Sequence, residues 1–213
     1  DVRLYLVLDP ERAGGRDPVA VAEAALRGGV TVLQLRWKNG PLREMLRLGE
    51  SLRDLCRRYG VPFLVNDRVA AALALAADGV HVGQEDLPAA VARRLLGPQA
   101  YVGVSARTPE QARAAEAEGA DYLGTGSVFP TGSKENAIWI GLEGLARVAR
   151  ATRLPVVAIG GVQAENAGAC IRAGAAGVAV ISAITLADDP EAAARALRSA
   201  VDAALAERGR PSP

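Results

Sequence analysis

Several residue types are scarce in this sequence, and each scarcity excludes a class of protein. Its 213 residues include two cysteines, Cys56 and Cys170, and one histidine, His81, so neither a disulfide framework nor a Cys/His zinc cluster is available. The 25 basic and 24 acidic residues leave a net charge of +1, which removes the electrostatic case for nucleic acid or an anionic membrane. The longest apolar run, Val69 to Ala77, is too short to span a bilayer. We therefore expect a cytoplasmic protein with small-molecule partners.

Lysine is scarce as well, because Lys38 and Lys134 are the only lysines among the 25 basic residues and the other 23 are arginine. A lysine ammonium is a compact point charge that can approach crowded phosphate oxygens, whereas the guanidinium is a bulkier planar fork. The two lysines therefore indicate candidate diphosphate-binding segments. Two lysines could fall there by chance, so this pattern supports the other evidence for a diphosphate site but does not prove it.

Short apolar segments alternate with amphipathic ones along the whole chain. The apolar segments predict eight strands, over residues 4–9, 32–36, 62–67, 79–83, 101–105, 122–127, 156–160 and 178–182. The segments between them have apolar residues at helical spacing; the clearest places Leu42, Met45, Leu52, Leu55 and Cys56 on one face.

Eight strand–helix units in this length predict an α/β fold, a single (β/α)8 TIM barrel over residues 1–207 with a flexible tail at 208–213. A doubly wound open sheet is the alternative. It requires a GxGxxG turn after the first strand, and residues 9–15 have none, so the barrel is favoured.

In such a barrel the site lies at the carboxyl ends of the strands. At the end of the second strand, alternation places Gln34, Arg36 and Lys38 on one face and turns Trp37 away from it. Two cations and an amide on one face predict an anion site. A structural salt bridge at the barrel mouth is an equally good interpretation from this strand alone.

Two aspartates follow neighbouring strands, Asp67 after the third and Asp86 after the fourth. Their carboxylates would converge on one ion, and a few hard oxygen ligands suit Mg²⁺, which keeps water and shares its shell with phosphate. Helix N-capping by either aspartate is the competing interpretation.

A polar loop follows the sixth strand and contains Thr131, Ser133 and Lys134, which are suited to gripping a phosphate, although the Walker A spacing is absent. Gly124 and Gly126, within that strand, indicate close approach of a ligand or of another backbone. The loop could equally be an ordinary flexible connection.

Gly160 and Gly161 follow the seventh strand, and Ile181 and Ser182 end the eighth. Loops at these positions of a barrel bind phosphate through backbone N–H groups, so they predict a phosphomonoester site unless the glycines serve only a tight turn. Two anion sites result, one suited to a diphosphate and one to a monophosphate. His81 lies within a strand, and we interpret it as a satisfied structural histidine rather than a catalytic base.

The motifs QLRWK, NDR, GVHVGQED, GVS, GTGSVFPTGSK, AIGG and VIS occur in this order, and with them the sequence resembles the thiamine phosphate synthase family. The resemblance implies a Mg²⁺-dependent transferase of thiamine biosynthesis. Such an enzyme joins hydroxymethylpyrimidine diphosphate to thiazole phosphate and releases pyrophosphate. In the family's dissociative mechanism diphosphate leaves first, and the thiazole nitrogen captures the pyrimidine-methyl cation.

The resemblance also implies roles for individual residues. Asp67 and Asp86 would bind Mg²⁺. Contacts with the pyrimidine substrate and its diphosphate would come from Gln34, Arg36, Lys38, Asn66, Ser105 and Lys134, of which Arg36, Lys38, Ser105 and Lys134 would be catalytic. Contacts with the thiazole substrate and its phosphate would come from Thr131, Ser133, Gly161, Ile181 and Ser182.

Three positions depart from the family pattern: Ser133 replaces threonine, Trp37 an acidic residue and Arg107 a histidine. An outward Trp37 would suit a homodimer interface or packing beneath a helix. A related thiazole tautomerase is the nearest alternative, but it uses a histidine where this chain has Arg107 and needs no diphosphate residues. A non-catalytic thiazole-phosphate-binding relative is a third alternative, disfavoured by the intact metal and diphosphate residues.

Overall fold

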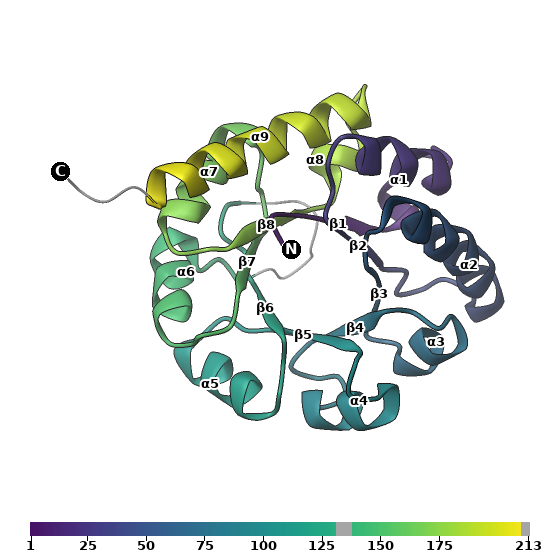
Figure 1. Ribbon diagram of the computed structural model, residues 1–213, viewed down its shortest axis with the longest axis horizontal. Helices are drawn as coiled ribbons and strands as arrows, with labels where there is room; N and C mark the ends of the chain where they lie inside the picture. Colours follow the sequence, from purple (N-terminus) through teal and green to yellow (C-terminus); the bar gives the residue numbers. More distant parts are fainter. Residues whose placement is uncertain (131–137, 210–213) are drawn as a thin grey trace.

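The strands pair in chain order and close on themselves, as the computed structural model shows for residues 1–130 and 138–209 (Figure 1). All pairs are parallel, and the first and last strands meet through the register Leu4 with Val178 and Leu6 with Val180. The prediction of a single (β/α)8 barrel is therefore confirmed. In a doubly wound sheet the first strand lies in the interior of the sheet and does not pair with the last, so the pairing of β1 with β8 excludes that alternative.

The eight predicted strand segments are all observed, with ends that differ by at most two residues. Their bounds are β1 Leu4–Leu8, β2 Val32–Leu35, β3 Phe63–Asn66, β4 Gly79–Val82, β5 Tyr101–Ser105, β6 Tyr122–Thr125, β7 Val156–Ile159 and β8 Gly177–Val180. Most predicted strands run too far at the carboxyl end, because the polar and glycine residues there leave the sheet and form the rim of the barrel.

Helices surround the barrel and connect successive strands (Figure 1). Their bounds are η1 Pro10–Arg12, α1 Pro18–Arg27, α2 Leu42–Tyr59, α3 Val69–Ala74, α4 Ala89–Leu96, α5 Pro109–Ala117, α6 Gly141–Arg150, α7 Ala164–Arg172, α8 Ser182–Thr185 and α9 Pro190–Arg208. None of these described helices has the length and apolar character needed to cross a membrane.

Local capping chemistry sets several helix boundaries. The Thr108 hydroxyl accepts a hydrogen bond from the Gln111 N–H, and Pro109 occupies the first helical position of α5. Gly60 ends α2 in the left-handed conformation with φ of 65°, which an L side chain rarely adopts. These caps match the stop and start signals in the sequence.

The segment predicted as a flexible tail, residues 208–213, lies mostly outside the described part of the chain. Helix α9 extends through Arg208, whose Nη1 donates hydrogen bonds to the carbonyl oxygens of Ile171 and Ala175 at 3.0 and 2.8 Å. These bonds attach the end of α9 to the neighbouring helix and the turn after it. Residues 210–213 lie outside the described part of the chain.

The apolar core has two layers, and strand β1 shows how alternation divides them. Leu4, Leu6 and Leu8 face the surrounding helices and join the large outer core, whereas Tyr5 and Val7 face the barrel interior. The predicted apolar face of α2 packs into the outer layer, with Cys56 fully buried; Leu42, in the first turn, is 52% exposed. Trp37 is half-buried against the same core, so it packs inside the fold.

We predict that Gly177→Ala destabilises the barrel at its closing seam. A Cβ at Gly177 would lie 1.8 Å from the Val2 carbonyl oxygen, and backbone atoms of a closed sheet have little room to move. The free energy of unfolding should fall by about 1–3 kcal/mol, measured by urea denaturation.

Gly209→Ala is the matched control, because its φ of −80° suits alanine and the nearest atom to its Cβ is 3.6 Å away. Equal stability of the Gly177→Ala variant and the wild type would contradict this view of the seam.

Candidate active site

A cavity of about 570 Å³ opens at the carboxyl ends of the strands. It collects residues that are far apart in the sequence, because parallel strands bring all their carboxyl ends to one rim. The predicted site residues that line it are Gln34, Arg36, Lys38, Asn66, Asp67, Asp86, Ser105 and Ile181. Thr131, Ser133 and Lys134 lie outside the described residues.

Asp67 and Asp86 lie next to each other at the cavity wall, and Lys38 Nζ lies 3.5 Å from Asp67 Oδ2. Asp86 Oδ2 also accepts a hydrogen bond from the Gly83 N–H at 2.7 Å, which fixes its carboxylate at the rim. Burial is the largest cause of a raised pKa at Asp67, the Asp86 carboxylate adds to it, and Lys38 opposes it. Burial and the second carboxylate therefore disfavour the charged form of Asp67 more than Lys38 favours it.

Neither aspartate caps a helix. Arg68 occupies the N-cap position of α3 and Pro88 that of α4, and the first N–H of α4, at Ala89, donates to the Glu118 carboxylate. Among the described residues no group of three or more His, Cys, Asp or Glu side chains is arranged so that it could hold a metal ion by itself. Two carboxylates facing a cavity suit Mg²⁺, which completes its shell with water and phosphate oxygens.

Asp67 has an unusual backbone, with φ of 59° in the left-handed region. Aspartate and asparagine tolerate this conformation better than most residues do. It turns the chain sharply at the end of β3, and the Asp67 N–H donates to the His81 carbonyl oxygen at 2.8 Å. The carboxylate is thus held at the rim by a strained turn anchored to β4.

The sequence left open whether Arg36 belongs to an anion site or to a structural salt bridge, and the structure shows features of both. It lines the cavity, and its Nη1 also donates to the carboxylate of Asp9, which is 1% exposed. Arg12 Nε lies 3.8 Å from the same carboxylate. Arg36 is therefore both a salt-bridge partner and a cation at the cavity, and its partner Asp9, the last residue of the predicted first strand, was missed.

Arg68, the last residue of the NDR motif, joins the loops after β2 and β3. Its Nη2 donates to the Lys38 carbonyl oxygen at 2.5 Å and its Nη1 to the Gly40 carbonyl oxygen at 3.3 Å. The loop that carries Lys38 is thereby tied to the turn that carries Asp67. The motif was the sequence signal, but which atoms Arg68 contacts depends on the tertiary fold.

A line of hydrogen-bonded side chains crosses the barrel interior below the charged rim. Gln34 Nε2 donates to the Tyr5 hydroxyl at 2.7 Å, and the hydroxyl oxygens of Tyr5 and Tyr122 lie 2.7 Å apart. His81 Nδ1 lies 3.0 Å from the Tyr122 hydroxyl, and His81 Nε2 lies 2.9 Å from Ser105 Oγ. His81 is thus hydrogen-bonded as expected, but it also lines the cavity.

Both tyrosines are buried at the bottom of the cavity, and two glycines make room for the rings. Burial raises the pKa of Tyr5 to about 12 and that of Tyr122 well above its ordinary value, so both hydroxyls keep their protons. A Cβ at Gly103 would lie 2.1 Å from the Tyr122 ring, and one at Gly124 would lie 2.9 Å from the His81 ring. The tyrosines were missed because a tyrosine in an apolar strand is usually a core residue.

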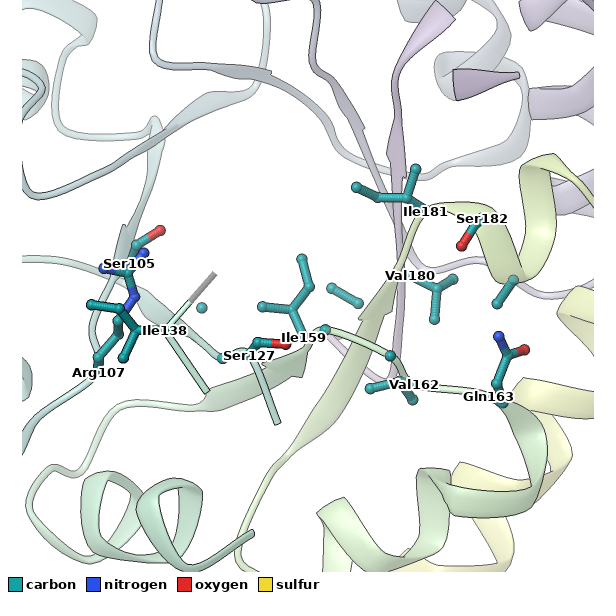
Figure 2. Close-up of a pocket in the computed structure, with 16 residues that line it drawn as sticks. Ser105, Arg107, Ser127, Ile138, Ile159, Val162, Gln163, Val180, Ile181 and Ser182 are labelled. Carbon is teal, nitrogen blue, oxygen red and sulfur yellow. The ribbon is translucent and has the colours of Figure 1, made fainter. Parts of the chain in front are cut away.

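A smaller pocket of about 70 Å³ continues from the cavity toward the loops after β7 and β8 (Figure 2). Ser105 and Arg107 lie at one end of it, and Gln163 and Ser182 lie at the other (Figure 2). The predicted residues Gly161, Ile181 and Ser182 all line it, so the structure brings the predicted phosphomonoester positions together.

The glycine pair in this pocket also has a purely structural explanation. Gly160 and Gly161 have φ of 100° and 65°. A Cβ at Gly160 would lie 2.3 Å from Ser127 Oγ, and one at Gly161 would lie 2.5 Å from the Pro130 carbonyl oxygen. The loop after β7 therefore needs two glycines to pack against the segment after β6, and the pair alone does not identify a phosphate site.

Comparisons with known proteins agree on one family. A sequence profile described as thiamine monophosphate synthase matches residues 4–184. The thiamine-phosphate synthase of Moorella thermoacetica is 53% identical over 199 residues, which cover 93% of this chain and 95% of that protein. The corresponding protein of Roseiflexus sp. is 53% identical over 208 residues, with coverages of 97% and 88%.

A solved structure agrees as well. The thiamine phosphate pyrophosphorylase from Pyrococcus furiosus matches with a TM-score of 0.88 and 44% sequence identity, and the match covers 96% of this chain and 97% of that one. The fold and the rim cavity are those of a (β/α)8-barrel enzyme, and the similarity to thiamine-phosphate synthases places the chain among the transferases. Within that class, the chain belongs to the thiamine monophosphate synthase family.

We predict that Asp67→Asn stabilises the protein at neutral pH when divalent cations are removed with a chelator. The pKa of Asp67 is higher in the folded protein than in the unfolded chain. The folded state therefore gains free energy of unfolding from the protonated carboxyl at low pH, and it loses this contribution as the pH rises through the folded-state pKa. Asparagine removes the charge and tolerates the left-handed backbone. Thermal unfolding should show a higher midpoint for the variant at neutral pH and a shrinking difference as the pH is lowered through this window.

Asp188→Asn, at an exposed position between α8 and α9, is the matched control and should leave the midpoint unchanged. A lower midpoint for Asp67→Asn at neutral pH would show that the aspartate pair does not strain the fold.

Proposed function

We propose that this transferase joins hydroxymethylpyrimidine diphosphate to thiazole phosphate, giving thiamine phosphate and pyrophosphate. The observation that carries the proposal is the undercompensated aspartate pair beside Lys38 in the rim cavity. A site with this charge pattern suits a metal-bound diphosphate. The names of the relatives from Moorella thermoacetica and Roseiflexus sp. support the same reaction.

The diphosphate end of the site is the rim formed after β2, β3 and β4. Lys38 and Arg36 contribute positive charge there, and Asn66 contributes an amide. Asp67 and Asp86 would hold Mg²⁺, which when bound neutralises diphosphate oxygens and makes the diphosphate a better leaving group. The Asp9 carboxylate holds the Arg36 guanidinium, and Arg68 holds the loop of Lys38, so both cations are positioned before the substrate arrives.

The pyrimidine end of the site is the barrel interior. Gln34 and Ser105 line the cavity from opposite ends of the hydrogen-bonded line of side chains. The apolar part of the cavity wall consists of Val7, Val157 and Ile159. These apolar side chains exclude water from the reacting carbon. In the proposed reaction the bond from the pyrimidine methylene carbon to the diphosphate oxygen breaks, and the oxygen keeps the electron pair. The thiazole nitrogen then supplies the pair for the new C–N bond.

The thiazole phosphate end is the smaller pocket. Ser182 offers a hydroxyl there and Gly161 a backbone N–H, and Arg107 contributes a cation at the opening shared with the main cavity. The family resemblance adds Thr131 and Ser133 to the thiazole side and Lys134 to the diphosphate side. The small pocket and the main cavity share several lining residues, and this continuity supports a direct transfer between the two substrates.

The decisive assay combines both substrates with Mg²⁺ and follows thiamine phosphate by chromatography. Product should form only when both substrates and the metal are present. A parallel reaction with the tautomeric thiazole carboxylate phosphate alone tests the isomerase alternative. Absence of thiamine phosphate beside an active family control would refute the proposal.

We further predict that Lys38→Ala and Asp86→Asn each lower kcat by about 10²–10³-fold. Lys38→Ala removes a positive charge that would stabilise the leaving diphosphate, and Asp86→Asn removes a carboxylate that would hold the Mg²⁺. Steady-state kinetics at saturating Mg²⁺ measures the loss. Asp188→Asn serves again as the control for charge removal outside the cavity. A variant that retains near-normal kcat would remove its residue from the proposed diphosphate site.

A further inference from the structure

The line of hydrogen-bonded side chains through the barrel draws on five strands. Gln34 lies on β2, Tyr5 on β1, Tyr122 on β6, His81 on β4 and Ser105 on β5. Each consecutive pair is within 3.0 Å, so every member is in direct hydrogen-bonding contact with the next. All five side chains line the cavity, and in the function proposed above the two ends of the line, Gln34 and Ser105, contact the substrate.

We propose that the amide of Gln34 sets the direction of this hydrogen-bond chain, so that His81 is held as the tautomer protonated at Nε2 and Ser105 presents its hydroxyl proton to the cavity. In this arrangement Tyr5 and Tyr122 are positioning residues that act through His81 on Ser105. The inference about Ser105 and substrate rests on the proposed function, whereas the tautomer of His81 does not.

The direction follows from counting protons at each oxygen. A tyrosine hydroxyl has one proton to donate, and the Gln34 Nε2 group can only donate. Because the Tyr5 oxygen accepts from Gln34, its own proton is available for Tyr122. The Tyr122 proton is then directed to His81 Nδ1, which must be unprotonated to accept it.

The same counting continues to the cavity. A neutral imidazole with an unprotonated Nδ1 carries its proton on Nε2, which therefore donates to Ser105 Oγ. The Ser105 oxygen accepts this bond and its own proton is directed elsewhere, toward an acceptor atom in the cavity. Ser105 therefore favours a substrate that places a hydrogen-bond acceptor atom next to its hydroxyl group.

The opposite orientation of the Gln34 amide would reverse every bond. Its carbonyl oxygen would accept from Tyr5, His81 would carry its proton on Nδ1, and Ser105 would donate to His81 instead of to the cavity. The two directions use the same heavy-atom positions, so they are told apart by the protons. Burial keeps Tyr5 and Tyr122 protonated, which preserves one donor at each step.

The rings have little freedom to rearrange. The centroids of Tyr5 and Tyr122 are 5.7 Å apart and those of His81 and Tyr122 are 5.5 Å apart. Gly103 and Gly124 leave space for these rings with no room for a Cβ. The chain is therefore preorganised by the barrel, which is what a positioning role requires.

The tautomer can be observed directly, because His81 is the only histidine in the sequence. Protein labelled with ¹⁵N-histidine is examined without substrate or metal, at a pH where the ring is neutral, in a long-range ¹H–¹⁵N correlation spectrum. The expected result is an Nδ1 shift typical of an unprotonated ring nitrogen and an Nε2 shift typical of a protonated one. The Nδ1–H tautomer, or an even mixture of the two, would overturn the proposal.

A second measurement distinguishes an effect of the hydrogen-bond direction from an effect of ring packing around His81. Tyr5→Phe keeps the ring but cuts the link between Gln34 and Tyr122, so the two ¹⁵N shifts of His81 should move toward each other as the tautomers mix. Tyr101→Phe is the control, because its side chain lies at the exposed start of β5. Unchanged His81 shifts in a folded Tyr5→Phe variant would show that Gln34 does not set the tautomer.

Kinetics then tests the effect on Ser105. Tyr5→Phe and Ser105→Ala should each reduce kcat/KM in the synthase assay by roughly threefold to tenfold, the loss expected for one hydrogen bond. Because both act through the Ser105 proton, the double variant should lose no more than Ser105→Ala alone. Independent, multiplying losses would overturn the coupling. If no thiamine phosphate forms at all, the proposed function is refuted. The NMR measurement of the His81 tautomer still tests whether Gln34 sets the direction of the hydrogen-bond chain.

Discussion

The closure of the parallel sheet is the constraint on which the rest of this structure depends. When β1 pairs with β8, all the strands point the same way around one axis, and their carboxyl ends meet at a single rim. Lys38, Asp67, Asp86 and Ser105 follow four different strands, yet they line one cavity because of this closure. The alternation of side chains along each strand then assigns one residue to the helices and the next to the interior.

The charges of the molecule are balanced overall but not within the site. A net charge of +1 in 213 residues conceals a rim where burial and the neighbouring Asp86 carboxylate raise the pKa of Asp67. Salt bridges elsewhere, such as that between Arg93 and Asp121 at 2.7 Å, pair their charges on the surface. The rim instead keeps two neighbouring carboxylates that Lys38 compensates only in part, an arrangement that suits a bound cation.

The interior of the barrel is polar along one line and apolar around it. A (β/α)8 barrel usually fills this space with branched aliphatic side chains. Here Tyr5, Tyr122 and His81 take part of it, and each is hydrogen-bonded to its neighbours along the line. A fully connected polar line is rigid, and it carries the effect of Gln34 across the barrel to Ser105.

Local sequence patterns were sufficient for the fold and for most of the rim. Strand segments, helix caps and the period-2 alternation at Gln34, Arg36 and Lys38 depend on neighbouring residues, so the amino-acid sequence alone was enough to predict them. The family motifs similarly pointed to Asp67 and Asp86.

Only the tertiary structure decided which distant groups meet. The Asp9 partner of Arg36, the Arg68 bonds to the loop of Lys38, and the contact of Tyr5 with Tyr122 join residues that are 27 to 117 positions apart. Such contacts are set by the register of the closed barrel rather than by local periodicity. The glycine pair at 160–161 shows the same limit, because its packing against the segment after β6 is visible only in three dimensions.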